Sequence, residues 1–165
     1  MTKVALVTGA ARGIGLATTD LLLERGWQVA MVDRDGDELT AAAGQLQGVL
    51  PVIADVSIPE QVDRMRDEAL ARFGRIDALV NNAGVALFSR AHQTAFEQWR
   101  EVMATNLDGV FLCTQALVPA LAESRGAIVN IASKTALTGQ GGTSAYVAAK
   151  AGILGLTREW AVDFL

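Results

Sequence analysis

VALVTGAARGIGLATTDLLLERG, residues 4–26, is the stretch that decides the fold we expect for this chain. It begins with a short apolar run, passes through a glycine-rich turn and becomes a helical pattern that stops at Gly26. A short, continuous apolar run is typical of a strand that is buried on both faces of a parallel sheet. The stretch therefore predicts a strand, a turn and a helix, which together begin a βαβ unit.

The same alternation continues along the chain. Further short apolar runs lie at residues 29–32, 52–54, 78–80 and 127–132, with helical patterns between them. Ser57-Ile-Pro-Glu60 and Thr94-Ala-Phe-Glu97 have the form of capping boxes, and each predicts the beginning of a helix. Strands and helices that alternate in this way form right-handed crossovers, so we expect an α/β fold with a doubly wound parallel sheet.

Composition excludes several classes of protein. Of the 165 residues 51% are apolar and 19% are charged, which suits one folded domain rather than a disordered chain. The net charge of −4 argues against nucleic acid as a partner, and no apolar run is long enough to span a membrane. The one cysteine, Cys113, is expected to be a small core or interface residue, and the lack of cysteine pairs and of a signal peptide favours a cytoplasmic location.

The glycine-rich turn has a spacing that suits phosphate binding. Gly9, Gly13 and Gly15 form a G-x-x-x-G-x-G pattern between the first strand and the first helix. Glycines allow a tight turn and a close approach of a pyrophosphate, while the helix N-terminus offers N–H groups and the positive end of a dipole. A plain turn can also be rich in glycine, but this position favours a dinucleotide site.

An acidic residue follows at the end of the second expected strand. Asp33 stands where a carboxylate can accept hydrogen bonds from the hydroxyls of an adenosine ribose. It would also repel a 2′-phosphate, and this favours NAD over NADP. Arg12 and Arg34 argue the other way, because either can pair with that phosphate. Asp55 follows the third strand, where it either reaches the adenine edge or caps the next helix.

The only tyrosine of the chain, Tyr146, lies four residues before Lys150 among small residues. On a helix this spacing places both side chains on one face. A free tyrosine has a pKa of about 10, and a neighbouring ammonium group favours the phenolate form. The pair is therefore suited to general acid–base catalysis, although a packing aromatic beside a solvated lysine is the alternative if these two residues are taken alone.

With Asn81-Asn-Ala-Gly84, Asn106 and Ser133, these motifs stand in an order and at spacings that resemble the short-chain dehydrogenase/reductase family over residues 3–165. The resemblance implies a Rossmann-type sheet with strand order 3-2-1-4-5 and an NAD(P)-dependent interconversion of a secondary alcohol and a ketone. It implies that Tyr146 is the general acid/base and that Lys150 supports it and binds the nicotinamide ribose. Ser133 would hold the substrate oxygen, and Asn106 would hold a water in a proton relay. Taken without the resemblance, Ser133 could be an ordinary strand-end cap and Asn106 an exposed helix residue.

The expected catalytic residues are therefore Asn106, Ser133, Tyr146 and Lys150. The expected cofactor-binding residues are Gly9, Arg12, Gly13, Ile14, Gly15, Asp33, Asp55, Val56, Asn82, Ala83, Gly84, Tyr146 and Lys150. No metal is expected, because the chain has one histidine and no pair of cysteines. The family also implies a homodimer or homotetramer, with apolar surface from Phe111, Leu112, Ile153, Leu156 and Trp160. The alternative for these side chains, which some of them must take, is packing onto the sheet of the same subunit.

The last apolar strand has no later segment that can pair with it, and an open edge of this kind invites aggregation. Either another chain covers this edge or the sequence is a portion of a longer protein, and we favour the second. We therefore expect residues 1–165 to be a single nucleotide-binding and catalytic domain that is truncated after the helix of Tyr146. The substrate remains open between sugars or polyols such as L-fucose and a 3-oxoacyl-(acyl-carrier-protein). A cofactor-binding module without turnover is the alternative of another class, because the family's later pocket segments are absent.

Overall fold

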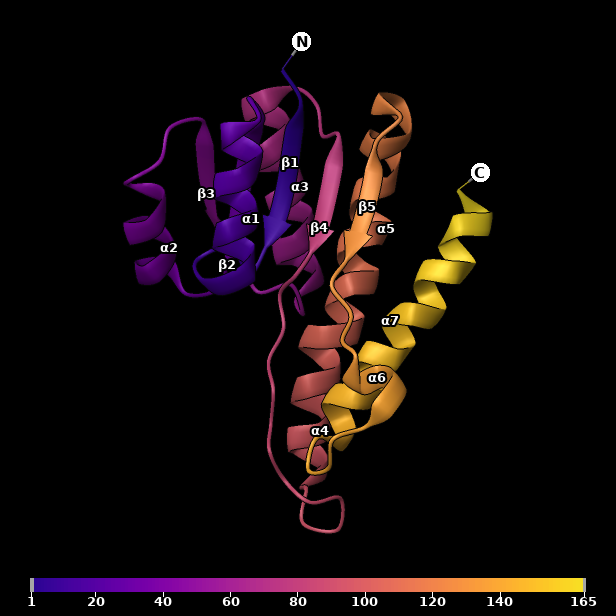
Figure 1. Ribbon diagram of the computed structural model, residues 1–165. Coiled ribbons are helices and arrows are strands. Elements are labelled where there is room, and N and C mark those ends of the chain that lie inside the picture. The colour runs from indigo at the N-terminus through magenta and orange to yellow at the C-terminus, as the bar shows by residue number, and fades with distance from the viewer. Residues whose placement is uncertain (1, 165) are drawn as a thin grey trace.

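The computed structural model describes residues 2–164, in which five parallel strands form one sheet (Figure 1). The strands are β1 (Val4–Thr8), β2 (Gln28–Asp33), β3 (Val49–Ile53), β4 (Ala78–Asn81) and β5 (Ala127–Asn130). Their order is β3-β2-β1-β4-β5, as the resemblance implied. The central strand β1 pairs with β2 on one side and β4 on the other, so the direction of winding changes between β1 and β4.

The helices between the strands are α1 (Gly13–Glu24), α2 (Gly36–Ala43), α3 (Pro59–Phe73), α4 (Phe96–Met103) and α5 (Gly109–Ser124), and two further helices, α6 (Thr135–Thr138) and α7 (Ser144–Asp163), follow β5. A π-helical turn, η1 (Ala104–Asp108), joins α4 to α5. The single long helix expected in this region is therefore a continuous helix with a widened turn in its middle. Neither this turn nor α2 and α6 was predicted from the sequence.

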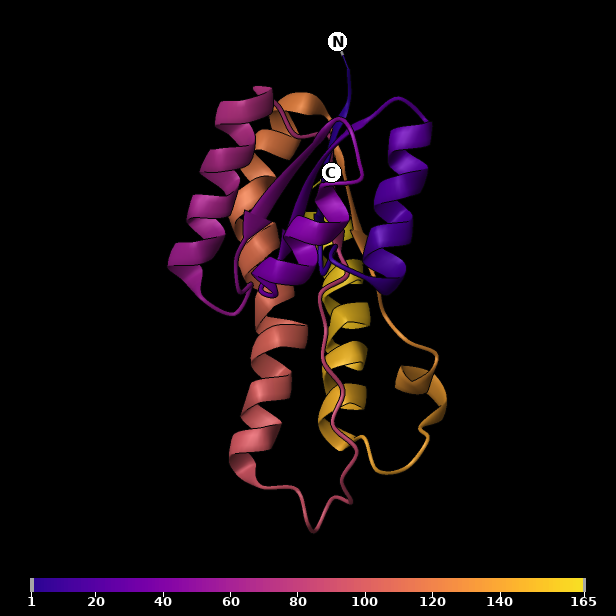
Figure 2. The ribbon, with the colours of Figure 1, turned by 90° about the vertical axis from the view of Figure 1, so that its left-hand side faces the viewer.

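Helices cover both faces of the sheet, so the expectation of a doubly wound fold is confirmed. Side chains of α3 and α5 pack with Leu6 and Leu79 on one face, while those of α1 and α2 pack with Val7 and Met31 on the other. Figure 2 shows the two layers edge-on, with α1 on one side and α3 and α5 on the other. All five residues of β1 are buried, which explains its unbroken apolar sequence.

Both predicted capping boxes are wrong. The N-cap of α3 is Ile58, whose side chain makes no cap hydrogen bond, because the Ser57 hydroxyl instead donates to the Asp55 carboxylate at 2.6 Å. A hydrogen bond to a charged carboxylate is stronger than one between neutral groups, so the Ser57 side chain binds Asp55, two residues earlier, and does not cap α3. Helix α4 begins one residue later than expected, with the Gln98 side chain accepting from the N–H of Ala95.

Two residues with more than one expected role lie in the core. Cys113 on α5 is 1% exposed, and burial raises the pKa of its thiol to about 12, which makes it an inert packing residue. Ile153 on α7 is 0% exposed, so of its two expected roles it does not supply apolar surface for association. Its side chain packs within its own protomer instead.

The loops that follow the five strands gather at one edge of the sheet. In Figure 1, α4 and the first half of α7 extend beyond the carboxyl ends of the strands, with the segment after β4 running alongside α4. Parallel α/β sheets bind their ligands at this edge, next to the point where the winding changes direction. None of the helices within residues 2–164 is both long and apolar enough to cross a membrane.

Candidate active site

A cleft of about 260 Å³ opens at the carboxyl ends of β1, β2 and β4. It brings together most of the residues expected to bind a cofactor, namely Gly9, Arg12, Ile14, Asp33, Asp55, Val56, Asn82, Ala83 and Gly84. Val32, Arg34, Ala54, Val85 and Thr105 also line it, although they were not in the expected set. The positions of Val32 and Ala54 at strand ends could have indicated them, whereas nothing in the sequence pattern marks Thr105.

The two loops on either side of the change in winding are tied together. The Thr8 hydroxyl accepts from the backbone N–H groups of Asn82 and Ala83, both at 3.0 Å. The Asn82 amide in turn donates to the carbonyls of Thr8 at 2.9 Å and Gly9 at 3.0 Å. The Asn82 side chain therefore fixes the shape of the glycine turn from behind.

The glycine turn is shaped by close backbone packing. Gly9 has a φ of +65°, and a Cβ there would lie 2.9 Å from the Cα of Ala83. A Cβ on Gly15 would lie only 2.0 Å from the Gly9 carbonyl oxygen. Gly13, also with a positive φ of +57°, has nothing within 4 Å of that position and is exposed. The turn is packed on one side and open on the other, where the first turn of α1 begins.

The first turn of α1 offers free donors to an anion. The N-cap residue is Arg12, whose side chain makes no cap hydrogen bond. The first N–H groups of a helix have no partner within the helix, and the positive end of the dipole lies beside them. The turn and the helix start together have the form of a phosphate cradle.

Asp33 is held in a defined orientation at the end of β2. One carboxylate oxygen accepts from the N–H of Ala11 and the other from the N–H of Asp35, both at 3.1 Å. Each carboxylate oxygen can accept more than one hydrogen bond, so acceptor capacity remains toward the cleft that Asp33 lines. Backbone N–H groups thus position the carboxylate, which forms no ion pair within residues 2–164.

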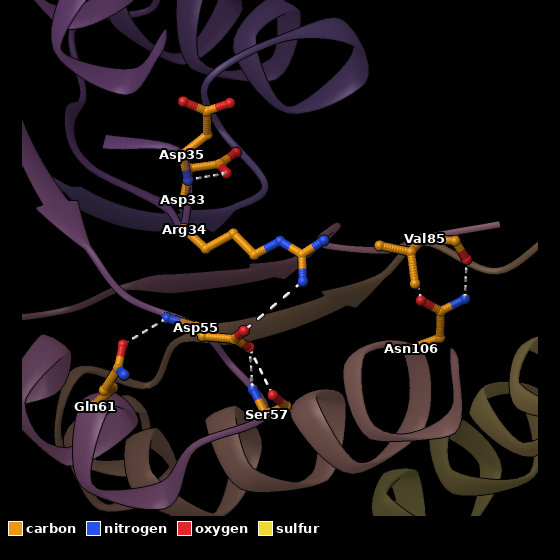
Figure 3. Close-up of polar contacts among 8 residues, drawn as sticks. All are labelled: Asp33, Arg34, Asp35, Asp55, Ser57, Gln61, Val85 and Asn106. Atoms are coloured by element: carbon orange, nitrogen blue, oxygen red, sulfur yellow. Dashed lines mark hydrogen bonds and ion pairs between the residues drawn. The ribbon is translucent and has the colours of Figure 1, made fainter. Parts of the chain in front are cut away.

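Asp55 stands across the cleft and is paired with Arg34, with the nearest nitrogen and oxygen 3.8 Å apart (Figure 3). It also accepts from the N–H of Ser57 at 2.9 Å and from its hydroxyl. Burial opposes the charge of Asp55, but the hydrogen bonds from Ser57 and the Arg34 guanidinium outweigh it and lower the pKa of the carboxyl. The carboxylate therefore fixes the turn before α3 and also lines the cleft, but it does not cap α3, whose N-cap is Ile58.

Asn106 is 0% exposed within the π-helical turn η1, so the alternative of an exposed helix residue is wrong. Its amide accepts from the N–H of Val85 at 2.7 Å and donates to the carbonyl of Val85 at 2.8 Å (Figure 3). These two bonds hold the segment after β4 against the widened turn. π-Helical turns occur preferentially at functional sites.

Lys150 and Tyr146 lie in the first turns of α7, with the lysine Nζ 5.8 Å from the centre of the tyrosine ring. Lys150 is 3% exposed and donates to the Ile131 carbonyl at 2.5 Å, so it is not a solvated helix residue. Burial lowers the pKa of its ammonium group. The amine is thus fixed between the loop after β5 and the ring of Tyr146.

Ser133 lies in the loop between β5 and α6, beyond the end of the strand at Asn130. Its hydroxyl is 2.8 Å from that of Thr135 and accepts from the Thr135 N–H at 3.2 Å. Thr135 begins α6, which packs against α7. Thr135 was not predicted, and no pattern in the sequence distinguishes it from other threonines.

A second hollow, of about 780 Å³, runs between β5 and α7 and contains none of the expected site residues. Its lining is mostly apolar, with Ile128 on the strand and Trp160 on the helix, so it does not suit a charged cofactor. Among residues 2–164 no group of three or more His, Cys, Asp or Glu side chains is arranged to hold a metal ion.

The chain matches known proteins over nearly all of its length. The model of the short chain dehydrogenase family matches residues 3–165. A 3-oxoacyl-[acyl-carrier-protein] reductase of Thermotoga maritima is 38% identical over 98% of this chain and 68% of its own length. A 2-(R)-hydroxypropyl-CoM dehydrogenase of Xanthobacter autotrophicus is 41% identical over 99% of this chain and 69% of its own length.

Solved structures agree with the sequence relatives. A 3-ketoacyl-(acyl-carrier-protein) reductase from Brucella melitensis, complexed with NADH, has a TM-score of 0.95 and 33% identity, covering 98% of this chain and 69% of that one. A short-chain dehydrogenase/reductase from Burkholderia phymatum in complex with NAD also has a TM-score of 0.95, at 30% identity and with 98% and 60% covered. From the family match, the sequence relatives and the sheet topology together, this chain belongs to the short-chain dehydrogenase family.

Proposed function

We propose that this protein binds NAD in the cleft at the carboxyl ends of β1, β2 and β4 and interconverts a secondary alcohol and a ketone. The observation that carries the proposal is the buried Lys150, which is fixed beside Tyr146 by the Ile131 carbonyl. A lysine that served only solubility would place its ammonium in water. The relatives support the reaction class, since each is named as a reductase or a dehydrogenase.

The cleft fits the adenosine and pyrophosphate parts of NAD. The open side of Gly13 and the free N–H groups at the start of α1 suit the pyrophosphate. Asp33, with acceptor capacity toward the cleft, suits the ribose hydroxyls. The two structural neighbours are named as complexes with NADH and NAD, which supports the same cofactor here.

NAD, when bound, supplies or accepts the hydride, and side chains of the protein donate or accept the proton. We assign the general acid/base to Tyr146, because a hydroxyl beside an ammonium group can give up and regain a proton during the reaction. Ser133 would donate to the substrate oxygen, where negative charge develops. Asn106 would hold the widened turn η1 and the segment after β4 in place for a proton path from Lys150.

For the substrate we propose a 3-oxoacyl thioester. Phe88 and Leu137 are exposed apolar side chains, at 77% and 78%. Ser89, next to Phe88, pairs with Thr143 immediately before α7, and Leu137 lies on α6, which contacts the same helix. An apolar entrance suits an acyl chain better than a sugar. The relative from Thermotoga maritima is named as a 3-oxoacyl reductase, which supports this choice.

The test is a substrate panel with wild type and Tyr146→Phe. Wild type should oxidise NADH with 3-oxoacyl thioesters, and Tyr146→Phe should lower kcat at least about 100-fold while NADH affinity stays within about threefold. Thr40→Ala, which removes an exposed hydroxyl from α2, serves as a control and should keep full activity. Undiminished turnover by Tyr146→Phe would contradict the assignment of the acid/base.

The other outcomes separate the alternatives. Turnover of sugars or polyols without turnover of thioesters would favour the carbohydrate substrate. NADH binding without turnover of any member of the panel would identify a cofactor-binding module. A failure to bind NADH would contradict the proposed function as a whole.

We also propose that the protein is cytoplasmic and that copies associate through α5 and α7. Phe111, which is 45% exposed, lines a shallow hollow with Leu112 and Leu156. A second copy would cover this apolar face. Light scattering should give a multiple of the 17.4 kDa chain mass for wild type and a smaller particle for Phe111→Glu.

A further inference from the structure

The cleft is lined by two arginines, Arg12 and Arg34, and each is engaged by carboxylates. Arg12 pairs with Glu38 and, at 3.5 Å, with Asp35. Arg34 extends across the cleft toward Asp55, as Figure 3 shows. A guanidinium that is already paired with carboxylates gains less binding energy from a further anion than an unpaired guanidinium does.

The two carboxylates that hold Arg12 are arranged by the start of α2. Asp35 is the N-cap, and one of its oxygens accepts from the N–H of Glu38 at 3.2 Å. Its other oxygen is the one that faces Arg12. Because the cap fixes the Asp35 side chain and Glu38 stands in the first turn, both charges are presented to Arg12 by a folded element rather than by a mobile chain.

The charges at this corner of the cleft disfavour a second phosphate. A 2′-phosphate on the adenosine ribose carries nearly two negative charges and would lie beside Asp33. Asp35 and Glu38 add two further negative charges within reach of Arg12. Binding the phosphate would require Arg12 to leave both carboxylates while these still repelled the ligand.

We propose that Asp35 and Glu38 are specificity-determining residues that keep Arg12 from the 2′-phosphate of NADP. The pairing of Arg12 with these two carboxylates adds to the repulsion of the 2′-phosphate by Asp33. It acts by occupying Arg12, a cation that would otherwise attract the 2′-phosphate of NADP. The inference rests on the proposed function, since it assumes that adenosine binds in this cleft. It predicts that the preference for NAD can be weakened while Asp33 is unchanged.

The experiment measures binding of AMP and of adenosine 2′,5′-bisphosphate by calorimetry. Asp35→Asn/Glu38→Gln should tighten binding of the bisphosphate about tenfold and change AMP affinity less than twofold. Asparagine caps helices as well as aspartate does, so α2 should remain folded. Adding Arg12→Ala to this pair should remove the gain.

Asp37→Asn is the matched control. It also removes one negative charge from the first turn of α2, but Asp37 forms no ion pair with Arg12 in the part of the chain that the structure describes. It should change bisphosphate affinity less than twofold, and Glu38→Gln alone should change it more. Equal effects of the two single variants would mean that overall charge, and not the pairing, sets the preference.

The remaining outcomes are decisive. An unchanged bisphosphate affinity in Asp35→Asn/Glu38→Gln, with AMP still bound, would overturn this inference and leave the proposed function intact. A gain that persists with Arg12→Ala would overturn it as well. If wild type bound neither AMP nor NADH, both the inference and the proposed function would be wrong.

Discussion

Gly15→Ala tests the packing behind the glycine turn. The new Cβ would lie 2.0 Å from the Gly9 carbonyl oxygen and 2.7 Å from the Asn82 amide nitrogen. Contacts with carbon settle near about 3.5 Å, so the turn would have to retreat by about 1.5 Å. This would break the two hydrogen bonds from Asn82, at about 1 kcal/mol each, and add about 2 kcal/mol of overpacking. Alanine returns about 1 kcal/mol through its higher helix propensity.

We therefore expect Gly15→Ala to lower the free energy of unfolding by about 3 kcal/mol and to weaken NADH binding. Urea unfolding monitored by tryptophan fluorescence would measure the free energy of unfolding, and a fluorescence titration would measure NADH binding. Gly155→Ala is the matched control, because Gly155 is exposed within α7 and a Cβ there meets nothing within 4 Å. It should stabilise by about 0.5–1 kcal/mol. A Gly15→Ala protein as stable as wild type that binds NADH normally would refute this reasoning.

Two further predictions concern buried charges. Burial lowers the pKa of Lys150 in the folded state. Between this lowered pKa and the unfolded pKa, the unfolded chain binds more protons than the folded chain, so wild type gains stability as pH rises. The unfolding free energy of wild type relative to Lys150→Met should therefore increase from pH 7 to 10, and a constant difference would contradict this. Asp77 is 7% exposed and accepts hydrogen bonds from the N–H of Val4 at 2.9 Å and from Arg75. Burial opposes the charge of Asp77, but these hydrogen bonds outweigh the effect of burial and lower the pKa of the carboxyl. Asp77→Asn should lose about 1–3 kcal/mol in urea unfolding at pH 7, and its difference from wild type should shrink as pH falls below the unfolded pKa of about 4 and through the lowered value; an undiminished difference at pH 2 would contradict the assignment.

The sheet could be predicted because each central strand is buried on both faces and therefore has a continuous apolar sequence. The edge strand β3 was predicted less well. Pro51 interrupts its apolar run, so the sequence indicated a strand over residues 52–54, whereas β3 spans Val49–Ile53. Proline is tolerated on an edge strand, where its missing N–H costs no ladder hydrogen bond. Local propensity does not reveal that a strand lies at an edge.

The residue types of the site could be predicted, but their hydrogen-bond partners could not. Asn82 and Asn106 were expected to line the cofactor pocket and to hold a water, and the sequence did not indicate that their amides also bind backbone groups of Gly9 and Val85. An amide can satisfy either partner equally well, so only the folded arrangement decides between them. The π-helical turn that carries Asn106 was missed because α5, which follows it, is apolar on most sides and so hides the shift of about 100° that one extra residue causes.

The position of Lys150 shows how the fold sustains an unfavourable group. Its acceptor, the Ile131 carbonyl, belongs to a residue whose N–H donates to the Asn81 carbonyl at 2.9 Å, which extends the pairing of β4 with β5. Asn130, one residue earlier, accepts from the Asn81 amide at 2.9 Å and donates to the Thr157 hydroxyl on α7 at 2.9 Å. The segment of β5 and helix α7 are thus joined at two points, Ile131 with Lys150 and Asn130 with Thr157. The cost of burying the amine is offset by a hydrogen bond to a carbonyl that the pairing of β4 with β5 holds in place, and this bond positions the ammonium beside the Tyr146 ring.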